Sequence, residues 1–224
     1  MTNKNKSLIV TVLDRSGSMQ TCKEATEQGM REFITAQRKL PGDVRMTLVQ
    51  FDTQYEEVFS NLPVTDESID SKLVLEPRGG TALYDAMCRA IDSTGAILAA
   101  LPEYERPGLV VFAIITDGGE NASREFKVED VRRRISTQTS KYNWQFTYLG
   151  ANQDAIMTAT TMGIAPSAAA NYDVANTKRT WSSMNSNVMR MQASSSMGQS
   201  INCTYSADER QGMVADPADP NQQP

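Results

Sequence analysis

The sequence predicts an α/β fold: a doubly wound, mostly parallel sheet with one antiparallel edge strand. Two continuous apolar runs, at residues 7–13 and 109–116, are rich in β-branched residues, which is typical of strands buried on both faces of a parallel sheet. Segments with apolar residues at helical spacing alternate with predicted strands from residue 7 to residue 192. This alternation predicts right-handed crossovers between parallel strands. A length of 224 residues suits one sizeable domain and is short for two.

After the first strand, the first half of the chain predicts a helix and an edge hairpin. Apolar residues at helical spacing predict a helix over residues 19–37, which ends before Pro41. Residues 44–51 and 55–59 are predicted strands, and the turn-forming residues 52–54 between them predict antiparallel pairing. We expect this hairpin at one edge of the sheet.

The second half of the chain continues the alternation. In the last predicted helix, the large apolar side chains Trp181, Met184, Val188 and Met191 fall at helical spacing, and we interpret them as core packing. The predicted elements are a helical turn at 67–73, helices at 83–101, 128–139, 154–162 and 177–192, and strands at 109–116, 144–149 and 168–172.

The sequence predicts a single domain at residues 1–199, which includes the helix at about 177–192. From about Ser194 onward, the chain is rich in Ser, Gln, Asn, Asp and Pro and has few large apolar residues. Such a composition buries too little apolar surface to offset the entropy of ordering the chain. We therefore predict that residues 200–224 form a polar, disordered tail that folding does not need.

The acidic composition argues against nucleic acid as a partner. The formal net charge is −5 at pH 7, whereas a protein that binds the phosphate backbone needs a concentrated positive surface. The basic cluster at residues 132–134 is flanked by Val131 and Ile135. We interpret this cluster as the solvated face of an amphipathic helix.

Cysteine and histidine usage narrows the chemistry and the compartment. The three cysteines are far apart and form no Cys-x-x-Cys pair, which argues against a disulfide framework and favours the reducing cytoplasm. The sequence contains no histidine, which removes Ser-His-Asp and Cys-His triads and imidazole zinc sites. The first apolar run ends at Asp14 and is too short for a signal-peptide core or a membrane span.

The segment Asp14-Arg15-Ser16-Gly17-Ser18 is the first indication of a metal site. It follows the first strand directly, at the carboxyl end, where open α/β sheets place their sites. In a loop loosened by Gly17, the aspartate and the two hydroxyls can turn three oxygen atoms toward one point. Oxygen-only ligands suit Mg²⁺ first and Mn²⁺ or Ca²⁺ after it. The alternative is that Asp14 caps the next helix.

Two later segments share features with the first. Gly79 and Gly80 permit a tight approach of the backbone, and Thr81 stands where a helix N-cap would stand. Asp117 follows the second buried-type strand and is itself followed by glycines. The two strands therefore deliver an aspartate each to the same edge of the sheet.

Together the three segments resemble the metal-ion-dependent adhesion site of von Willebrand factor A (VWA) domains, which have a Rossmann-like fold. The resemblance implies that hydroxyls ligate a divalent cation and that two carboxylates hold it directly or through water. Neutral hydroxyls leave the cation electrophilic, so an open sixth position can take an Asp or Glu of a partner protein. The residues that match the family's metal site are Asp14, Ser16, Ser18, Thr81 and Asp117.

The likeness covers roughly residues 5–175, and its chief departure is Gly119, where related proteins often carry an acidic residue. It implies a non-catalytic, Mg²⁺-dependent protein-interaction module of the stand-alone, intracellular type found in bacteria and their viruses. The expected location is the cytoplasm, or the host cytoplasm for a viral protein. Partner preference stays open because of Gly119.

Two other classes of function share features with this sequence but lack a motif that they need. A Mg²⁺-dependent phosphatase or phosphotransferase of the haloacid-dehalogenase type also begins with an aspartate after a first strand, but it needs a second aspartate where Ser16 stands. A nucleotide-binding Rossmann module needs a Gly-x-Gly-x-x-Gly or a phosphate-binding loop after a strand, and neither motif occurs here. A thermal-stability screen with Mg²⁺, Mn²⁺, EDTA, a phosphatase substrate and nucleotides separates the three functions. Stabilisation by the metal alone would favour the interaction module.

Overall fold

A six-stranded sheet forms the centre of the molecule in the computed structural model, which describes residues 2–152 and 154–214. The strand order is β3-β2-β1-β4-β5-β6. β3 pairs antiparallel with β2, and the other neighbouring strands pair in parallel. The described strands are β1 (Asn3–Asp14), β2 (Asp43–Phe51), β3 (Tyr55–Pro63), β4 (Pro107–Thr116), β5 (Gln145–Gly150) and β6 (Ala169–Asn171). The predicted fold class, with its antiparallel edge strand, is confirmed.

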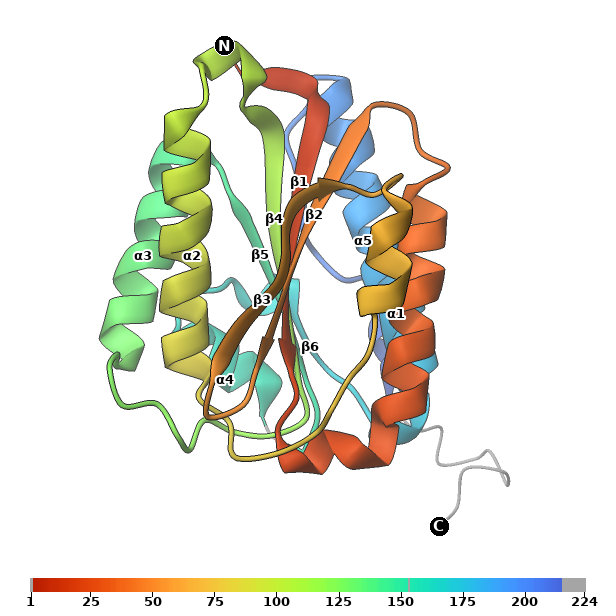
Figure 1. The fold of residues 1–224 in the computed structure, drawn as a ribbon, viewed down its shortest axis with the longest axis vertical. Coiled ribbons are helices and arrows are strands. Elements are labelled where there is room, and N and C mark those ends of the chain that lie inside the picture. The colour runs from red at the N-terminus through yellow and green to blue at the C-terminus, as the bar shows by residue number, and fades with distance from the viewer. Residues whose placement is uncertain (1, 153, 215–224) are drawn as a thin grey trace.

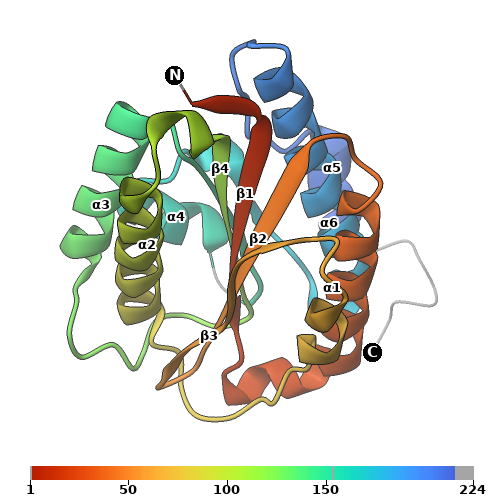
Figure 2. The ribbon, with the colours of Figure 1, turned by 45° about the horizontal axis from the view of Figure 1, so that its top comes forward.

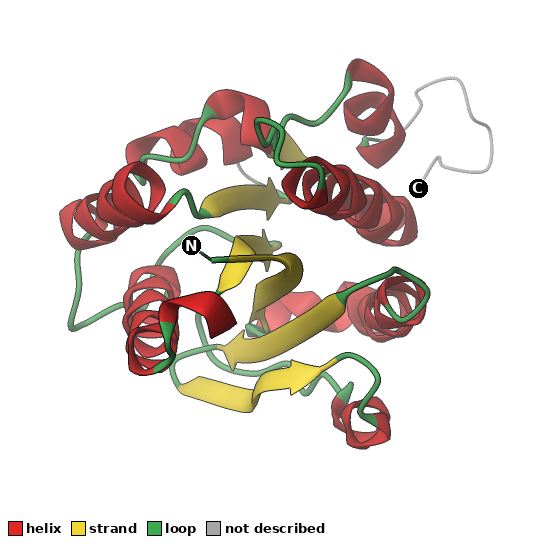
Figure 3. Cartoon of the chain, turned by 90° about the horizontal axis from the view of Figure 1, so that it is seen from above, coloured by secondary structure: helices red, strands yellow, loops and turns green. Residues whose placement is uncertain are grey.

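Helices cover both faces of this sheet (Figures 1 and 3). Helices α2, α3 and α4 lie on one face, and α1, α5 and α6 lie on the other (Figure 2). Among the described residues, no helix is long and apolar enough to cross a membrane. The α-helices are α1 (Lys23–Gln37), α2 (Leu83–Ala100), α3 (Val128–Tyr142), α4 (Ala155–Thr161), α5 (Thr177–Ser196) and α6 (Ala207–Met213), and short 3-10 turns include η1 (Gly17–Cys22) and η2 (Glu67–Lys72).

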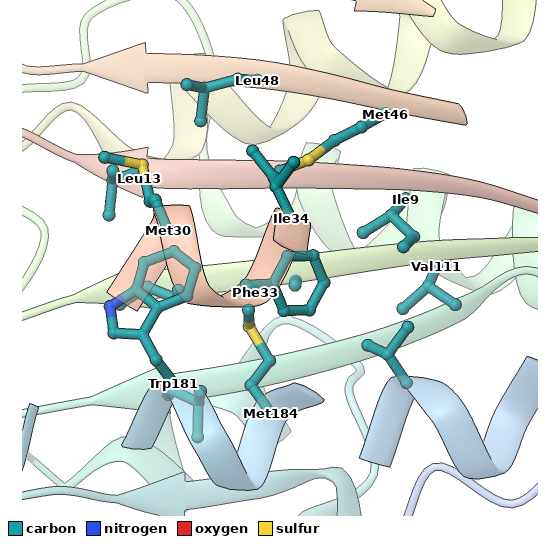
Figure 4. Packing of buried hydrophobic residues seen from close by; sticks show 14 of the residues in the cluster. Ile9, Leu13, Met30, Phe33, Ile34, Met46, Leu48, Val111, Trp181 and Met184 are labelled. Atoms are coloured by element: carbon teal, nitrogen blue, oxygen red, sulfur yellow. The ribbon is translucent and has the colours of Figure 1, made fainter. Parts of the chain in front are cut away.

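The apolar stripe of α5 packs against α1 and the sheet. Phe33 and Trp181 meet edge to face with 6.2 Å between ring centroids, and Met184 lies beside them (Figure 4). A Cβ atom on Gly29 would lie 2.3 Å from the indole of Trp181, so the glycine lets the two helices approach closely. The interpretation of this stripe as core packing is confirmed. The packing also holds α1, which follows the segment of Asp14, Ser16 and Ser18 in the chain.

The basic cluster lies on a solvated helix face, as predicted. In α3, Val131 and Ile135 are buried, whereas Arg132 and Arg133 are exposed. Arg134 reaches across to α2 and donates hydrogen bonds to the carboxylate of Asp92 at 2.8–3.0 Å. Its charge is therefore already paired.

Residues 201–214 correct the prediction of a tail that begins at residue 200. Tyr205 is 2% exposed and Met213 is fully buried, and both belong to the core on the α1 and α5 side. Asn187 in α5 donates a hydrogen bond to the carbonyl oxygen of Cys203 at 2.9 Å. The segment has few apolar residues, but α6 contacts α5 and β6, and two large apolar side chains of the segment are buried in the core. The rest of the predicted tail, residues 215–224, lies outside the described residues.

Candidate metal centre

Two buried carboxylates meet at the carboxyl edge of the sheet because β1 and β4 are parallel neighbours. Asp14 is the last residue of β1, and Asp117 follows the last residue of β4. Leu13 and Ile115 are paired in register, so both chains leave the sheet side by side. This edge lies at the bottom of Figure 1, where η1 follows β1.

Asp14 is fully buried and both of its carboxylate oxygens accept hydrogen bonds. The backbone N–H of Ser16 donates to Oδ1 at 2.6 Å, and the hydroxyl of Thr116 donates to Oδ2 at 2.6 Å. Burial raises the pKa of Asp14 to about 6, although these hydrogen bonds act in the opposite direction, and the nearby charge of Asp117 adds to the rise. The first loop therefore holds a carboxylate whose charge is poorly compensated.

The serine hydroxyls connect the first loop to Asp117. The Oγ atoms of Ser16 and Ser18 lie 3.2 Å apart, and Ser18 donates a hydrogen bond to Asp117 Oδ1 at 2.6 Å. Ser16 is buried, whereas Ser18 is exposed. The hydroxyls therefore line a path from the buried carboxylates to the surface.

The second oxygen of Asp117 is left without a partner. Oδ2 is buried and accepts no hydrogen bond from any of the described residues. Burial also raises the pKa of Asp117 above its ordinary value, against the hydrogen bond from Ser18. Since a buried polar atom without a partner costs about 1–3 kcal/mol, this oxygen is poised for a ligand that the protein alone does not provide.

Thr81 reaches the same place from the second loop. An ideal Cβ atom on Gly118 would lie 3.5 Å from Thr81 Oγ1 and 3.7 Å from Ser18 Oγ. The two hydroxyls therefore flank the backbone just after Asp117. Thr81 does not cap the following helix, because α2 begins at Leu83 and its N-cap residue has no side-chain capping bond.

Asn121 clamps the backbone of Thr81. The side-chain oxygen of Asn121 accepts a hydrogen bond from the backbone N–H of Thr81 at 2.9 Å. The backbone N–H of Asn121 donates a hydrogen bond to the carbonyl oxygen of Thr81 at 3.0 Å. Gly80 makes room for this contact, because a Cβ there would lie 2.8 Å from the Asn121 oxygen. Gly80 thus permits the close backbone approach that the sequence predicts.

The loop after Asp117 also caps the start of α2. Glu120 accepts a hydrogen bond from the backbone N–H of Tyr84 at 3.0 Å, and the hydroxyl of Ser123 accepts one from Asp85 at 3.1 Å. Asp85 in turn accepts a hydrogen bond from the backbone N–H of Phe126 at 2.9 Å. These reciprocal bonds lock the second and third loops together.

The donor set fits a small, hard dication. The five residues that match the family's metal site lie together, and they offer two carboxylates and three hydroxyls. Within residues 2–152 and 154–214, no group of three or more His, Cys, Asp or Glu side chains is placed to hold a metal. A cation here would therefore depend on the hydroxyls, and an all-oxygen donor set favours Mg²⁺, Mn²⁺ or Ca²⁺ over softer metals.

Three residues close to Asp117 in sequence support the site in ways that the sequence did not reveal: Thr116, Glu120 and Asn121. Thr116 holds Asp14, Asn121 holds Thr81, and Glu120 holds the start of α2. The sequence feature that could have indicated these roles is the cluster of polar residues immediately after a buried strand. Side chains in such a position commonly satisfy the free backbone groups of a turn.

One family model matches the chain, and several solved structures share its fold. A family model described as the von Willebrand factor type A domain matches residues 9–120. No curated protein sequence matches the chain. Among solved structures, the chain is similar to a von Willebrand factor type A protein from Catenulispora acidiphila, with a TM-score of 0.61 and 18% identity over 83% of this chain and 43% of that chain.

Two further solved structures have the same fold. The PilB minor pilin from Streptococcus sanguinis has a TM-score of 0.59 and 13% identity, over 84% of this chain and 62% of that chain. Proximal thread matrix protein 1 from the mussel byssus is described with zinc in its MIDAS motif, the metal-ion-dependent adhesion site. It has a TM-score of 0.52 and 15% identity, over 74% of this chain and 41% of that chain. The chain spans less than two thirds of each of these proteins, and at such identities the likeness concerns the fold.

Proposed function

Because the chain belongs to the von Willebrand factor type A domain family, we propose that it is a Mg²⁺-dependent protein-interaction module. Its three loops hold the cation through oxygen atoms, and a partner protein completes the coordination with an aspartate or glutamate. The proposed metal residues are Asp14, Ser16, Ser18, Thr81 and Asp117.

The observation that carries this proposal is the unpaired Oδ2 atom of Asp117. It is a buried carboxylate oxygen without a partner among the described residues, next to a second buried carboxylate on Asp14. Two carboxylates buried next to each other are unfavourable while both are charged, and positive charge between them offsets this cost. A divalent cation held at this point would supply that charge.

The chemistry of the donor set suggests what the cation does. When bound, the cation would supply an electrophilic centre for an anionic ligand. Three of the five proposed donors are neutral hydroxyls, so they would leave most of the cation's charge available to an incoming carboxylate. Ser18 and the backbone of Gly119 are exposed, which leaves an approach to the site from solvent. Mg²⁺ is proposed over zinc because all the donors are oxygen atoms.

The module is proposed to be non-catalytic and cytoplasmic. No observation favours the phosphatase alternative, since Ser16 stands where its acid–base aspartate is needed. Cys22 and Cys88 are buried free thiols and Cys203 is a half-buried one, which fits the reducing compartment that the cysteine usage predicts.

Metal-dependent stabilisation tests the site. At a hundredfold excess of Mg²⁺ over its dissociation constant, binding adds about 2.7 kcal/mol to the free energy of unfolding. Asp14→Ala and Asp117→Ala should abolish this gain, whereas Asp92→Ala, which removes an exposed carboxylate on α2, should keep it. Thermal unfolding of each variant in Mg²⁺ and in EDTA measures the difference. If both site variants respond to Mg²⁺ like the parent, the site is assigned wrongly.

Partner capture tests the second half of the proposal. Proteins retained by the immobilised chain in Mg²⁺ and released by EDTA are candidate partners. Thr81→Ala removes one hydroxyl and spares both charges, so it should weaken partner binding more than metal binding, by about 2–5 kcal/mol. A partner whose affinity is the same in EDTA would dock elsewhere, and the metal would then be only structural.

A further inference from the structure

A fourth segment, the turn between β2 and β3, lies against the first two metal loops. Its Asp52 is 1% exposed, and one oxygen, Oδ2, accepts two hydrogen bonds from arginines. Nε of Arg15 donates at 2.9 Å, and Nε of Arg78 donates at 2.8 Å. Arg15 lies between Asp14 and Ser16 in the first loop, whereas Arg78 precedes the glycines of the threonine loop. One carboxylate therefore joins both loops.

Backbone hydrogen bonds join the same segments. The N–H of Arg78 donates to the carbonyl of Arg15 at 2.8 Å, and the N–H of Gly17 donates to the carbonyl of Gly79 at 3.2 Å. The N–H of Ala82, next to Thr81, donates to the carbonyl of the same aspartate at 3.0 Å. The two loops thus contact each other directly, and the turn holds the backbone next to Thr81.

Asp52 is itself unavailable as a metal ligand. Its Oδ1 accepts a hydrogen bond from the backbone N–H of Gln54 at 2.6 Å, and its Oδ2 is taken by the two arginines. Arg15 is also buried and forms a second ion pair, with Glu56. This saturated carboxylate contrasts with Asp117, whose Oδ2 is free.

We propose that Asp52 is a positioning residue: through Arg15 and Arg78 it sets the spacing between the serine and threonine hydroxyls, and thereby the affinity of the metal centre. The inference rests on the proposed function, since it assumes that those hydroxyls bind the cation. Residues that orient metal ligands without touching the metal typically contribute 10–100-fold to metal affinity.

Arg78→Gln separates positioning from electrostatics. Removing a positive charge near a cation site should tighten Mg²⁺ binding if charge alone matters. If Arg78 positions the threonine loop, the dissociation constant for Mg²⁺ should instead rise by about 10–100-fold in a calorimetric titration. Arg78→Lys keeps the charge and one donor, and should recover part of the affinity. A dissociation constant that is unchanged or lower in Arg78→Gln overturns the inference.

Amide hydrogen exchange in EDTA tests the contact without metal. In Arg78→Gln, the amides of Gly17 and Ala82 should exchange faster, because their acceptors belong to the segments that Asp52 joins. Arg133→Gln removes an exposed arginine that pairs with Asp130, and should alter neither exchange nor Mg²⁺ affinity. If the parent binds no Mg²⁺, the proposed function fails, and unchanged exchange at both amides would overturn the inference independently.

Discussion

The metal-centre loops and the C-terminal segment 201–214 differ in which buried polar group lacks a partner among the described residues. In the C-terminal segment, Ser206 and Glu209 form a capping box at the start of α6, and Arg190 of α5 binds the same glutamate. At the metal centre, Asp14 and Asp117 lie buried next to each other, and one carboxylate oxygen has no partner among the described residues. In the C-terminal segment the buried atom without a partner among the described residues is the neutral hydroxyl of Tyr205, whereas at the metal centre it is a carboxylate oxygen, whose charge a cation can neutralise.

The two regions also differ in the contacts that hold them to the rest of the molecule. The C-terminal segment is anchored by two large buried side chains, Tyr205 and Met213. The first loop is held to the threonine loop and to the β2–β3 turn mainly by hydrogen bonds and arginine pairs. We therefore expect changes in the C-terminal segment to act on global stability, and changes in the loops to act on metal binding.

The largest expected effect is the loss of stability on deletion of residues 201–224. The deletion removes Tyr205 and Met213 from the core, and truncation of a single large aromatic side chain in a core costs about 3–5 kcal/mol. The free energy of unfolding in urea should fall by at least that amount. Deletion of residues 215–224 is the control, because it leaves every described contact in place. Equal stability of the parent and the longer deletion would mean that folding does not need the segment.

Asp117→Asn should change stability in opposite directions with and without metal. In EDTA, the neutral amide no longer buries an uncompensated charge, and the free energy of unfolding should rise by roughly 1 kcal/mol. In saturating Mg²⁺, the variant should lack the gain of about 2.7 kcal/mol that the parent shows at a hundredfold excess. Asp92→Asn loses only its exposed ion pair with Arg134 and should keep the full Mg²⁺ gain. Loss of stability in EDTA would mean that the carboxylate is already compensated without a cation.

Alanine substitution of a glycine should have opposite effects on stability in the two regions, at Gly80 of the threonine loop and at Gly212 of α6. A Cβ on Gly80 would lie 2.8 Å from the side-chain oxygen of Asn121, so Gly80→Ala should cost about 1–3 kcal/mol and weaken Mg²⁺ binding. A Cβ on Gly212 in α6 would meet nothing within 4 Å, so Gly212→Ala should add about 0.4–1 kcal/mol. Chemical denaturation of both variants measures the difference. The same effect in both would show that contact with Asn121 is unimportant.

The smallest expected effect is acid weakening of the α6 contact. Burial would raise the pKa of Glu209, but hydrogen bonds from Arg190 and Ser206 lower it below its ordinary value of 4.5. A lowered pKa in the folded state means that the contact stabilises above pH 4.5 and is lost as the pH falls through the folded value. The loss should be about 1 kcal/mol or less. Glu209→Gln should remove this pH dependence, so the stabilities of parent and variant should converge as the pH falls below 4.5.

The sequence predicted the elements well because each carries its own periodic signal. Strands such as β1 and β4 are continuous apolar runs that end at a polar residue, and helix α5 shows its apolar stripe directly. The C-terminal segment carries no such signal. Tyr205 and Met213 are eight residues apart in a largely polar stretch, so their burial depends on contacts with α5 and β6 that no periodic pattern encodes.

The sequence by itself determined the type of chemistry at the candidate centre. Two buried strands each end at an aspartate, and parallel strands bring their carboxyl ends to one edge. The hydroxyls of Ser16 and Ser18 lie within a few residues of the first of those ends. Thr81, in a glycine-rich loop, is assigned to the same site by the resemblance to the VWA family, since its position alone is equally typical of a helix cap. That these oxygen atoms bind Mg²⁺ remains a prediction.

Only the tertiary structure decided how these atoms are held and which of them is left without a partner. Asp52 is distant in sequence from both arginines that it binds, and Asn121 is 40 residues from the threonine that it clamps. No local pattern encodes such contacts, because they depend on how the loops meet after the sheet has formed. Likewise, Asp14 and Asp117 look alike in sequence, and only burial and neighbouring donors leave one oxygen of Asp117 unsatisfied.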